Sequence, residues 1–163
     1  MRVACGLALL VVAAAGVSGQ TKKSYDGPRP VKADVPYLLE AGRLTEVESA
    51  EAQQKDEKDA VVYTIPGSTS PTRTPMPEPI FLFKSDRINP ERLSLYRMES
   101  KGGNRVISIS TGKKAKGSQK PVFLMVNRLE AGLYRVEVNE YIENGEYCLT
   151  PEGSNKTFCF TTY

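Results

Sequence analysis

Short apolar or alternating runs follow one another at near-regular spacing through most of the chain after residue 60. The runs lie at 61–65, 80–83, 92–98, 105–110, 122–127, 133–139, 146–150 and 157–162. Clusters of Gly, Asn, Pro and other turn-forming residues separate them. Several short strands spaced in this way are typical of an all-β sandwich or barrel. We therefore predict an all-β fold, a small antiparallel β-sandwich of Ig-like or barrel-like form.

The pattern inside each run predicts how far each strand is buried. The runs IFLF (80–83) and VFLMV (122–126) are apolar at successive positions, which predicts central strands covered on both faces. The run 133–139 alternates apolar and polar residues, which predicts one buried face and one exposed face.

The last two runs predict a hairpin with a defined register. If Cys148 lies opposite Cys159, both cysteines share one face of the hairpin and four large apolar residues share the other. Those four residues are Tyr147, Leu149, Phe158 and Phe160. One register thus satisfies both a disulfide and a core, so we predict a Cys148–Cys159 disulfide, with two buried free thiols as the alternative.

The N-terminus has the pattern of a secretory signal peptide. Arg2 precedes an apolar stretch over 3–17, and Val17 and Gly19 suit the −3 and −1 positions of a cleavage site. About 15 apolar residues form a helix of only ~22 Å, too short for a bilayer core, although an uncleaved anchor is the alternative. We expect an exported protein, periplasmic or extracellular, with no membrane span after cleavage. Cleavage also removes Cys5 and leaves an even number of cysteines, which favours a disulfide.

The rest of the chain divides into two parts. Residues 20–58 are expected to form an extended, partly helical N-terminal segment, because 45–58 is rich in helix formers and Thr45 and Glu48 have capping-box spacing. A short surface helix or a charged loop fits 45–58. Residues 59–163 are expected to form the β-sandwich domain. Its Pro-rich loop, 66–79, either docks on a partner's aromatic groove or simply connects two strands.

The composition removes many kinds of chemistry. The chain has no histidine, which excludes Ser-His-Asp and Cys-His catalysis and His-ligated metal sites. No phosphate-binding loop or dinucleotide fingerprint is present, and a net charge of +3 does not indicate a nucleic-acid binder. We predict no catalytic residues, no metal site and no cofactor.

Three weak candidates for function remain. Ser110 and Lys113 have the S-x-x-K spacing of serine acyltransferases but lack the helix that this motif needs. Glycosidases use a pair of carboxylates, and the series Glu137, Glu140, Glu143 and Glu146 could supply one. Solvated positions on strands and turns explain this series better. The basic turn residues are Lys113, Lys114, Lys116 and Lys120. They either contact an anionic surface or keep a hairpin soluble.

Three short stretches resemble parts of certain small exported bacterial proteins of unknown function. The first is the C-terminal pattern ENGEYC at 143–148 with FCF at 158–160. The stretch DVPYLL at 34–39 and the run PERL at 90–93 are also similar to that group. The resemblance implies bacterial export and a β-fold, and it transfers no functional residue.

These observations favour an exported, non-enzymatic β-sandwich module of the cell envelope with a binding or structural accessory role. Its partner is expected to be an envelope protein or a wall polymer. Two alternatives stay open at this stage. One is a small secreted hydrolase that acts on wall or surface polymers through acidic residues, and the other is a carrier of a small apolar ligand, which needs a pocket.

Overall fold

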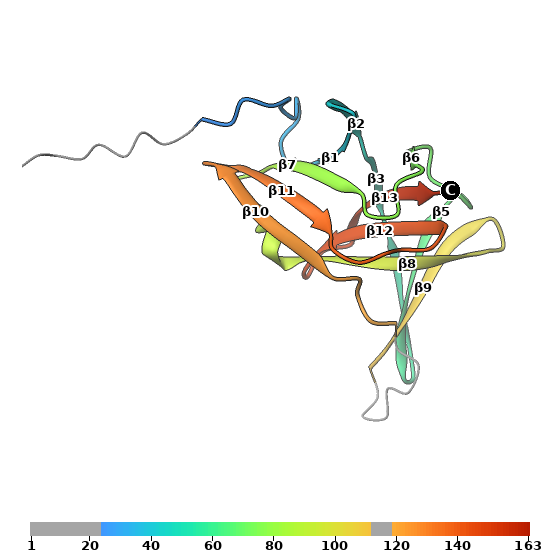
Figure 1. Ribbon diagram of the computed structural model, residues 1–163. Helices are drawn as coiled ribbons and strands as arrows, with labels where there is room; N and C mark the ends of the chain where they lie inside the picture. Colours follow the sequence, from blue (N-terminus) through green and yellow to red (C-terminus); the bar gives the residue numbers. More distant parts are fainter. Residues whose placement is uncertain (1–23, 112–118) are drawn as a thin grey trace, which may run out of the picture.

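The computed structural model describes residues 24–111 and 119–163, and it is built from antiparallel β-sheets packed against each other (Figure 1). The prediction of an all-β sandwich or barrel-like fold is confirmed. In the described residues the only helical element is a 3-10 turn at Pro90–Arg92. No helix in this part of the chain has the length and apolar character needed to cross a membrane.

The first sheet has five strands in the order β10-β11-β7-β1-β2. Their bounds are β1 Pro36–Glu40, β2 Arg43–Glu46, β7 Ile80–Lys84, β10 Leu124–Glu130 and β11 Leu133–Val138. The central strand β7 buries Phe81, Leu82 and Phe83 completely, as the IFLF run predicts. The same prediction for VFLMV is wrong, because β10 is an edge strand: Met125 in it is 38% exposed, and Phe123, which precedes it, is 61% exposed.

The second sheet has eight strands. Seven of them follow the order β3-β13-β12-β8-β9-β5-β4, and the eighth, the short β6 (Arg73–Thr74), pairs with β13 beside this path. The bounds are β3 Glu48–Glu51, β4 Gln53–Glu57, β5 Ala60–Pro66, β8 Leu93–Lys101, β9 Asn104–Ser110, β12 Gly145–Pro151 and β13 Lys156–Thr162. The two strands at the ends of this path, β3 and β4, are consecutive in the chain and separated only by Ala52. The ends of the sheet therefore meet, and the sheet curls into a barrel-like shape.

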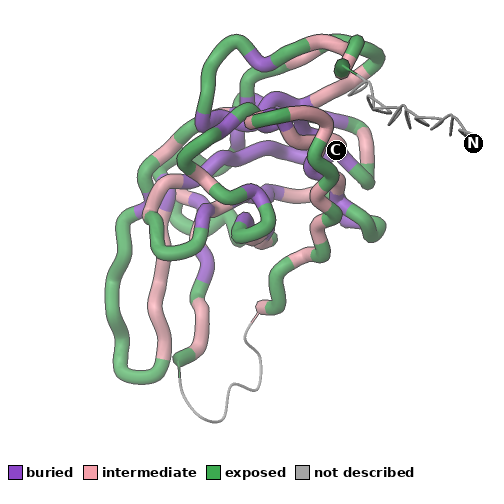
Figure 2. The backbone as a smooth tube through the Cα atoms, turned by 90° about the vertical axis from the view of Figure 1, so that its left-hand side faces the viewer, coloured by how far each residue is buried: buried purple, intermediate pink, exposed green. Residues whose placement is uncertain are grey.

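The curled sheet consists of two halves. Strands β3, β13, β12 and β8 form a middle layer that packs on the five-stranded sheet, and β4, β5 and β9 form a third layer on its other side. In Figure 1 the β4–β5 hairpin and the end of β9 extend below the rest of the molecule. Figure 2 shows one strand of the β4–β5 hairpin as exposed and the other as intermediate, while buried residues concentrate in the packed layers.

The closing hairpin β12–β13 has the predicted register. Cys148 pairs with Cys159 and the two form a disulfide. The four large apolar residues of the hairpin face the five-stranded sheet, where Phe81 lies 5.1 Å from Phe160 between ring centroids. The cysteines face the opposite side, toward the third layer. The two faces of one hairpin therefore belong to two different cores.

The prediction of a surface helix in 45–58 is wrong. These residues form the end of β2 together with β3 and β4, which pair with β13 and β5. Backbone pairing at both edges of the curled sheet outweighs the local helix propensity. The segment 20–58 also contributes β1, so its strands pair with those of 59–163 in both sheets, and the expected boundary at residue 59 does not separate two structures.

The Pro-rich loop 66–79 crosses one end of the curled sheet. It contains the two-residue strand β6, Arg73–Thr74, which pairs in parallel with β13. Ser70, Thr72 and Thr74 are buried. This packing against its own chain fits the interpretation of the loop as a connection.

Candidate functional site

The inside of the curled sheet is lined by alternate residues of each strand, because successive side chains of a strand point to opposite faces. Along β9 the inward residues are Arg105, Ile107 and Ile109. Tyr63 and Ile65 of β5 lie opposite Ile107 and Arg105. The interior is therefore polar at the Arg105 end and apolar around Ile107, and it is partly open to solvent at the Ile109 end.

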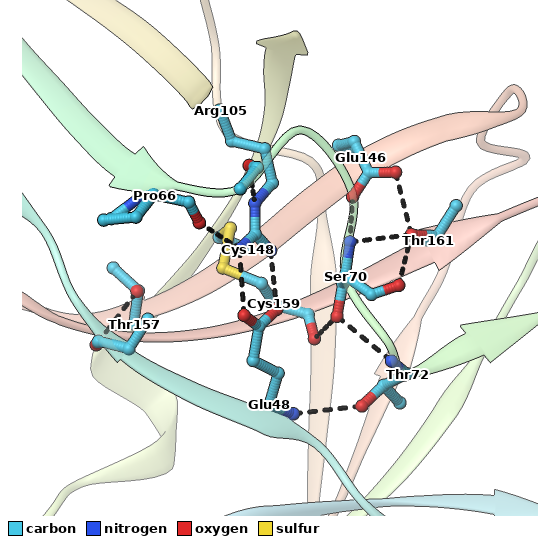
Figure 3. A network of polar contacts seen from close by, with 12 residues as sticks. Glu48, Pro66, Ser70, Thr72, Arg105, Glu146, Cys148, Thr157, Cys159 and Thr161 are labelled. Atoms are coloured by element: carbon cyan, nitrogen blue, oxygen red, sulfur yellow. Dashed lines mark hydrogen bonds and ion pairs between the residues drawn. A yellow bond between two sulfur atoms is a disulfide. The ribbon is translucent and has the colours of Figure 1, made fainter. Parts of the chain in front are cut away.

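A buried ion pair closes the polar end (Figure 3). The Arg105 side chain is 1% exposed, and its two terminal nitrogens donate to the two carboxylate oxygens of Glu48 at 2.6 and 2.9 Å. Arg105 also donates to the carbonyl oxygens of Pro66 and Gly67, both at 3.0 Å. Burial acts to raise the pKa of Glu48, but the hydrogen bonds and charge of Arg105 outweigh it and the pKa is lowered.

A second buried carboxylate completes this closed end. Glu146 accepts hydrogen bonds from the backbone nitrogen of Ser70 at 2.9 Å and from the hydroxyl of Thr161 at 2.8 Å. The Ser70 hydroxyl in turn donates to the carbonyl oxygen of Cys159 at 2.8 Å. Both carboxylates are thus held by neighbouring groups, and the network ties the Pro-rich loop to the hairpin (Figure 3).

Above this network lies an apolar layer. It consists of Ile65, Met98, Ile107 and the Cys148–Cys159 disulfide, all buried. Tyr63, Tyr96 and Ile109 pack against it and are only partly buried. The apolar layer thus borders a region that none of the described residues fills.

That region is a pocket of about 360 Å³ between the middle and third layers. Tyr96 of β8 lies on one wall, and Tyr63 of β5 with Ile109 of β9 lies on the other. The floor is formed by Ile65, Met98, Ile107 and Cys148. A volume of this size with apolar walls is in the range of small-molecule binding sites.

The pairing of β8 explains why the pocket exists. β8 pairs with β12 from Leu93 to Met98, but with β9 only from Glu99 to Lys101. From Met98 back toward Leu93, β8 is therefore no longer paired with β9, and the two halves of the sheet separate there. Side chains on the separated parts of β8 and β9 face the pocket instead of each other.

The rim of the pocket comes largely from the tip of the β12–β13 hairpin. Residues 151–155 line the mouth, together with Gln54, Ser94, Thr150 and Thr157. The backbone nitrogen of Ala52 donates to the carbonyl oxygen of Asn155 at 2.8 Å, and Glu152 is paired with Arg92. The Cys148–Cys159 disulfide joins the two strands of the same hairpin near their middle. The rim is therefore braced below by the disulfide and at its tip by these contacts.

A second hollow, of about 520 Å³, lies beside the turn that follows β7. It is more open and is lined by charged side chains, including Asp86, Arg87 and Arg128. The first pocket is the better binding site, because it is more enclosed and more of its surface is apolar.

The residues singled out from the sequence do not converge on one site. Lys113, Lys114 and Lys116 lie outside the described residues, and Lys120 is exposed. The carboxylate series is dispersed: Glu137 pairs with Arg135, Glu140 accepts from the backbone of Phe123, Glu143 pairs with Arg97 and Glu146 is buried in the closed end. Ser110 donates to a backbone carbonyl, and its partner in the S-x-x-K spacing, Lys113, is not described.

Of the predicted site residues that the structure describes, Cys148 lines the pocket. Tyr63, Tyr96 and Ile109 gave no signal beyond β-strand patterning, because the splitting of the sheet places them at a pocket. Within residues 24–111 and 119–163, no cluster of three or more His, Cys, Asp or Glu side chains is placed to hold a metal ion. The geometry supports binding of a small molecule more directly than it supports acid–base chemistry.

Comparison of the chain with protein-family models, with curated proteins and with solved structures finds no match in any of the three.

Proposed function

We propose that the protein is an exported, non-enzymatic binding module that holds a small, largely apolar ligand inside its curled sheet. The single observation that carries this proposal is the pocket of about 360 Å³ with an apolar floor and partly open tyrosine walls. A chain that needed only stability would gain by filling this volume, since burying apolar side chains stabilises a fold.

Export is the second part of the proposal. It is supported by the signal-peptide pattern at 1–19 and by the cysteine pair, because disulfides persist in oxidising compartments. An envelope protein or wall polymer remains the expected partner class for the outer surface, for which the exposed Phe123 and Tyr141 offer apolar contact area. The pocket gives the more specific role.

The proposal predicts that a neutral apolar probe binds in the pocket. N-phenyl-1-naphthylamine, whose fluorescence rises in apolar surroundings, is titrated into purified protein lacking residues 1–19. Ile109→Trp is expected to abolish saturable binding, because the indole fills the space between the two layers. Ser108→Trp is the matched control, since Ser108 is the adjacent, exposed residue of β9 and does not line the pocket.

Circular dichroism of both variants establishes that the fold is retained. Absence of saturable binding to the unsubstituted protein, or equal binding to Ile109→Trp, would overturn the proposal. Native mass spectrometry of protein purified without detergent adds an independent readout, because a co-purifying ligand appears as a discrete added mass that Ile109→Trp lacks.

A further inference from the structure

The shape of the pocket limits the ligand more than its volume does. The polar network of Arg105, Glu48 and Glu146 closes one end, and residues 151–155 line the mouth. Arg105 and Ile109 are four residues apart on β9, a distance of about 13 Å along the strand. The apolar part therefore accepts a short, compact group, and a long alkyl chain would project from the mouth.

The walls favour a ring. Tyr63 and Tyr96 lie on facing layers, and their aromatic rings are only partly buried by the protein itself. Below them are the Met98 thioether and the disulfide. Aromatic faces and polarisable sulfur both interact favourably with a ring placed between them. This set of side chains suits a flat ring system better than a branched aliphatic group.

The charge at the mouth disfavours an anion. Among the lining residues that the structure describes, Glu152 alone carries a charged side chain, and it is a carboxylate paired with Arg92. The other rim groups are neutral, and neither tyrosine hydroxyl donates to a described residue. Among the described lining residues an anionic head group would lose water without gaining an opposite charge, whereas a single hydroxyl or carbonyl group finds neutral partners.

From these three observations we infer that the ligand is a compact, uncharged molecule with an aromatic or other flat ring and one polar group directed to the mouth. This inference rests on the proposed function, because it specifies the ligand of the same pocket. Judged by the described lining residues, it disfavours fatty acids and other amphiphiles with a long chain and an anionic head.

The experiment compares probes of one shape and different charge. 2-Naphthalenemethanol, 2-naphthoate and 2-naphthylmethylammonium are titrated calorimetrically at neutral pH, together with 1-decanol as the chain-shaped probe. We expect the alcohol to bind at least about tenfold more tightly than the carboxylate, because the carboxylate must be desolvated without a cation. We expect decanol to bind more weakly than 2-naphthalenemethanol.

Variants locate the ring. Tyr63→Leu and Tyr96→Leu are each expected to weaken 2-naphthalenemethanol binding roughly three- to tenfold, the value of one aromatic contact. Tyr163→Leu is the control, because Tyr163 is 56% exposed and does not line the pocket. Tighter binding of naphthoate or decanol than of the alcohol would overturn this inference and leave the proposed function standing. The absence of any probe binding that Ile109→Trp blocks would instead overturn the proposed function.

Discussion

Replacing Arg105 by Leu is expected to lower the free energy of unfolding by about 3 kcal/mol. Removing one partner of a buried ion pair costs about 3–5 kcal/mol, because the other charge is left without compensation. The Glu48 side chain is 22% exposed and keeps some contact with water, which places the expected cost at the lower end. The carbonyl groups of Pro66 and Gly67 also lose their donor.

The measurement is urea denaturation followed by far-ultraviolet circular dichroism, a suitable probe because the chain has no tryptophan. A lower urea concentration at the unfolding midpoint, with an unchanged dependence of the unfolding free energy on urea concentration, identifies a change in stability. Arg97→Leu is the matched control: Arg97 pairs with Glu143, their side chains are 45% and 73% exposed, and the expected cost is below about 1 kcal/mol. Equal costs for Arg105→Leu and Arg97→Leu would refute the assignment of Arg105 to the closed end.

The pH dependence gives this prediction a second readout. Because the pKa of Glu48 is lowered in the folded protein, its ion pair stabilises the fold above the ordinary pKa of glutamate. That contribution is lost as the pH falls through the folded value. The stability difference between the unsubstituted protein and Arg105→Leu should therefore shrink on acidification below 4.5, the ordinary pKa of a glutamate side chain. A difference that stays constant down to pH 3 would contradict the ion-pair explanation.

Two further predictions concern the hairpin and the start of β1. Replacing Cys148 and Cys159 together by Ala should cost about 3 kcal/mol, since the bridge closes a loop between residues 11 apart, and reduced unsubstituted protein should melt at the same temperature as the variant. Asp34→Asn should cost about 1–3 kcal/mol at pH 7, because Asp34 is buried and accepts from Ser85 and Arg87. The Ser85 hydrogen bond, with Arg87, lowers the pKa of Asp34. The difference in unfolding midpoint should therefore fade as the pH drops below 3.8, the ordinary pKa of an aspartate side chain. A cost that persists at low pH would argue against an ionised Asp34 in the fold.

Much of the fold could be predicted from local patterns. The register of the β12–β13 hairpin followed from Cys148 and Cys159, because a shift by one residue would place the cysteines and the large apolar residues on the wrong faces. The burial of IFLF in β7 followed from its unbroken apolar run. The run VFLMV carries the same local signal and lies at an edge, because strand order in a sheet depends on pairing between distant segments.

The pocket could not be predicted in the same way. It depends on β3 continuing into β4 and on β8 leaving β12 for β9, and neither event has a local sequence signal. Residues 45–58 have the local composition of a helix, so their sequence does not predict β3 and β4, which join the two halves of the sheet. Tyr63 and Tyr96 are ordinary strand residues until that closure brings their two layers together.

The two faces of the middle layer explain why one core is full and the other contains a pocket. Toward the five-stranded sheet the hairpin presents Phe158 and Phe160, and these rings pack against Phe83 and Phe81. Toward the third layer it presents the smaller Cys148 and Cys159, with Ala52 beside them. The disulfide holds the hairpin together on the side where side-chain bulk is missing, so the fold tolerates an unfilled volume.

Filling the pocket is therefore expected to stabilise the protein and to remove its binding of an apolar ligand. Ser94 is half-buried on the pocket wall, and Ser94→Leu adds apolar surface there; it should raise the free energy of unfolding by about 1 kcal/mol. The same variant should weaken binding of N-phenyl-1-naphthylamine, which urea denaturation and fluorescence titration measure on one sample. A variant that is less stable yet binds the probe normally would show that the added leucine side chain does not fill the binding volume, and it would contradict this expectation. A gain in stability coupled to a loss of binding would show that this chain gives up stability at the pocket in order to bind a ligand.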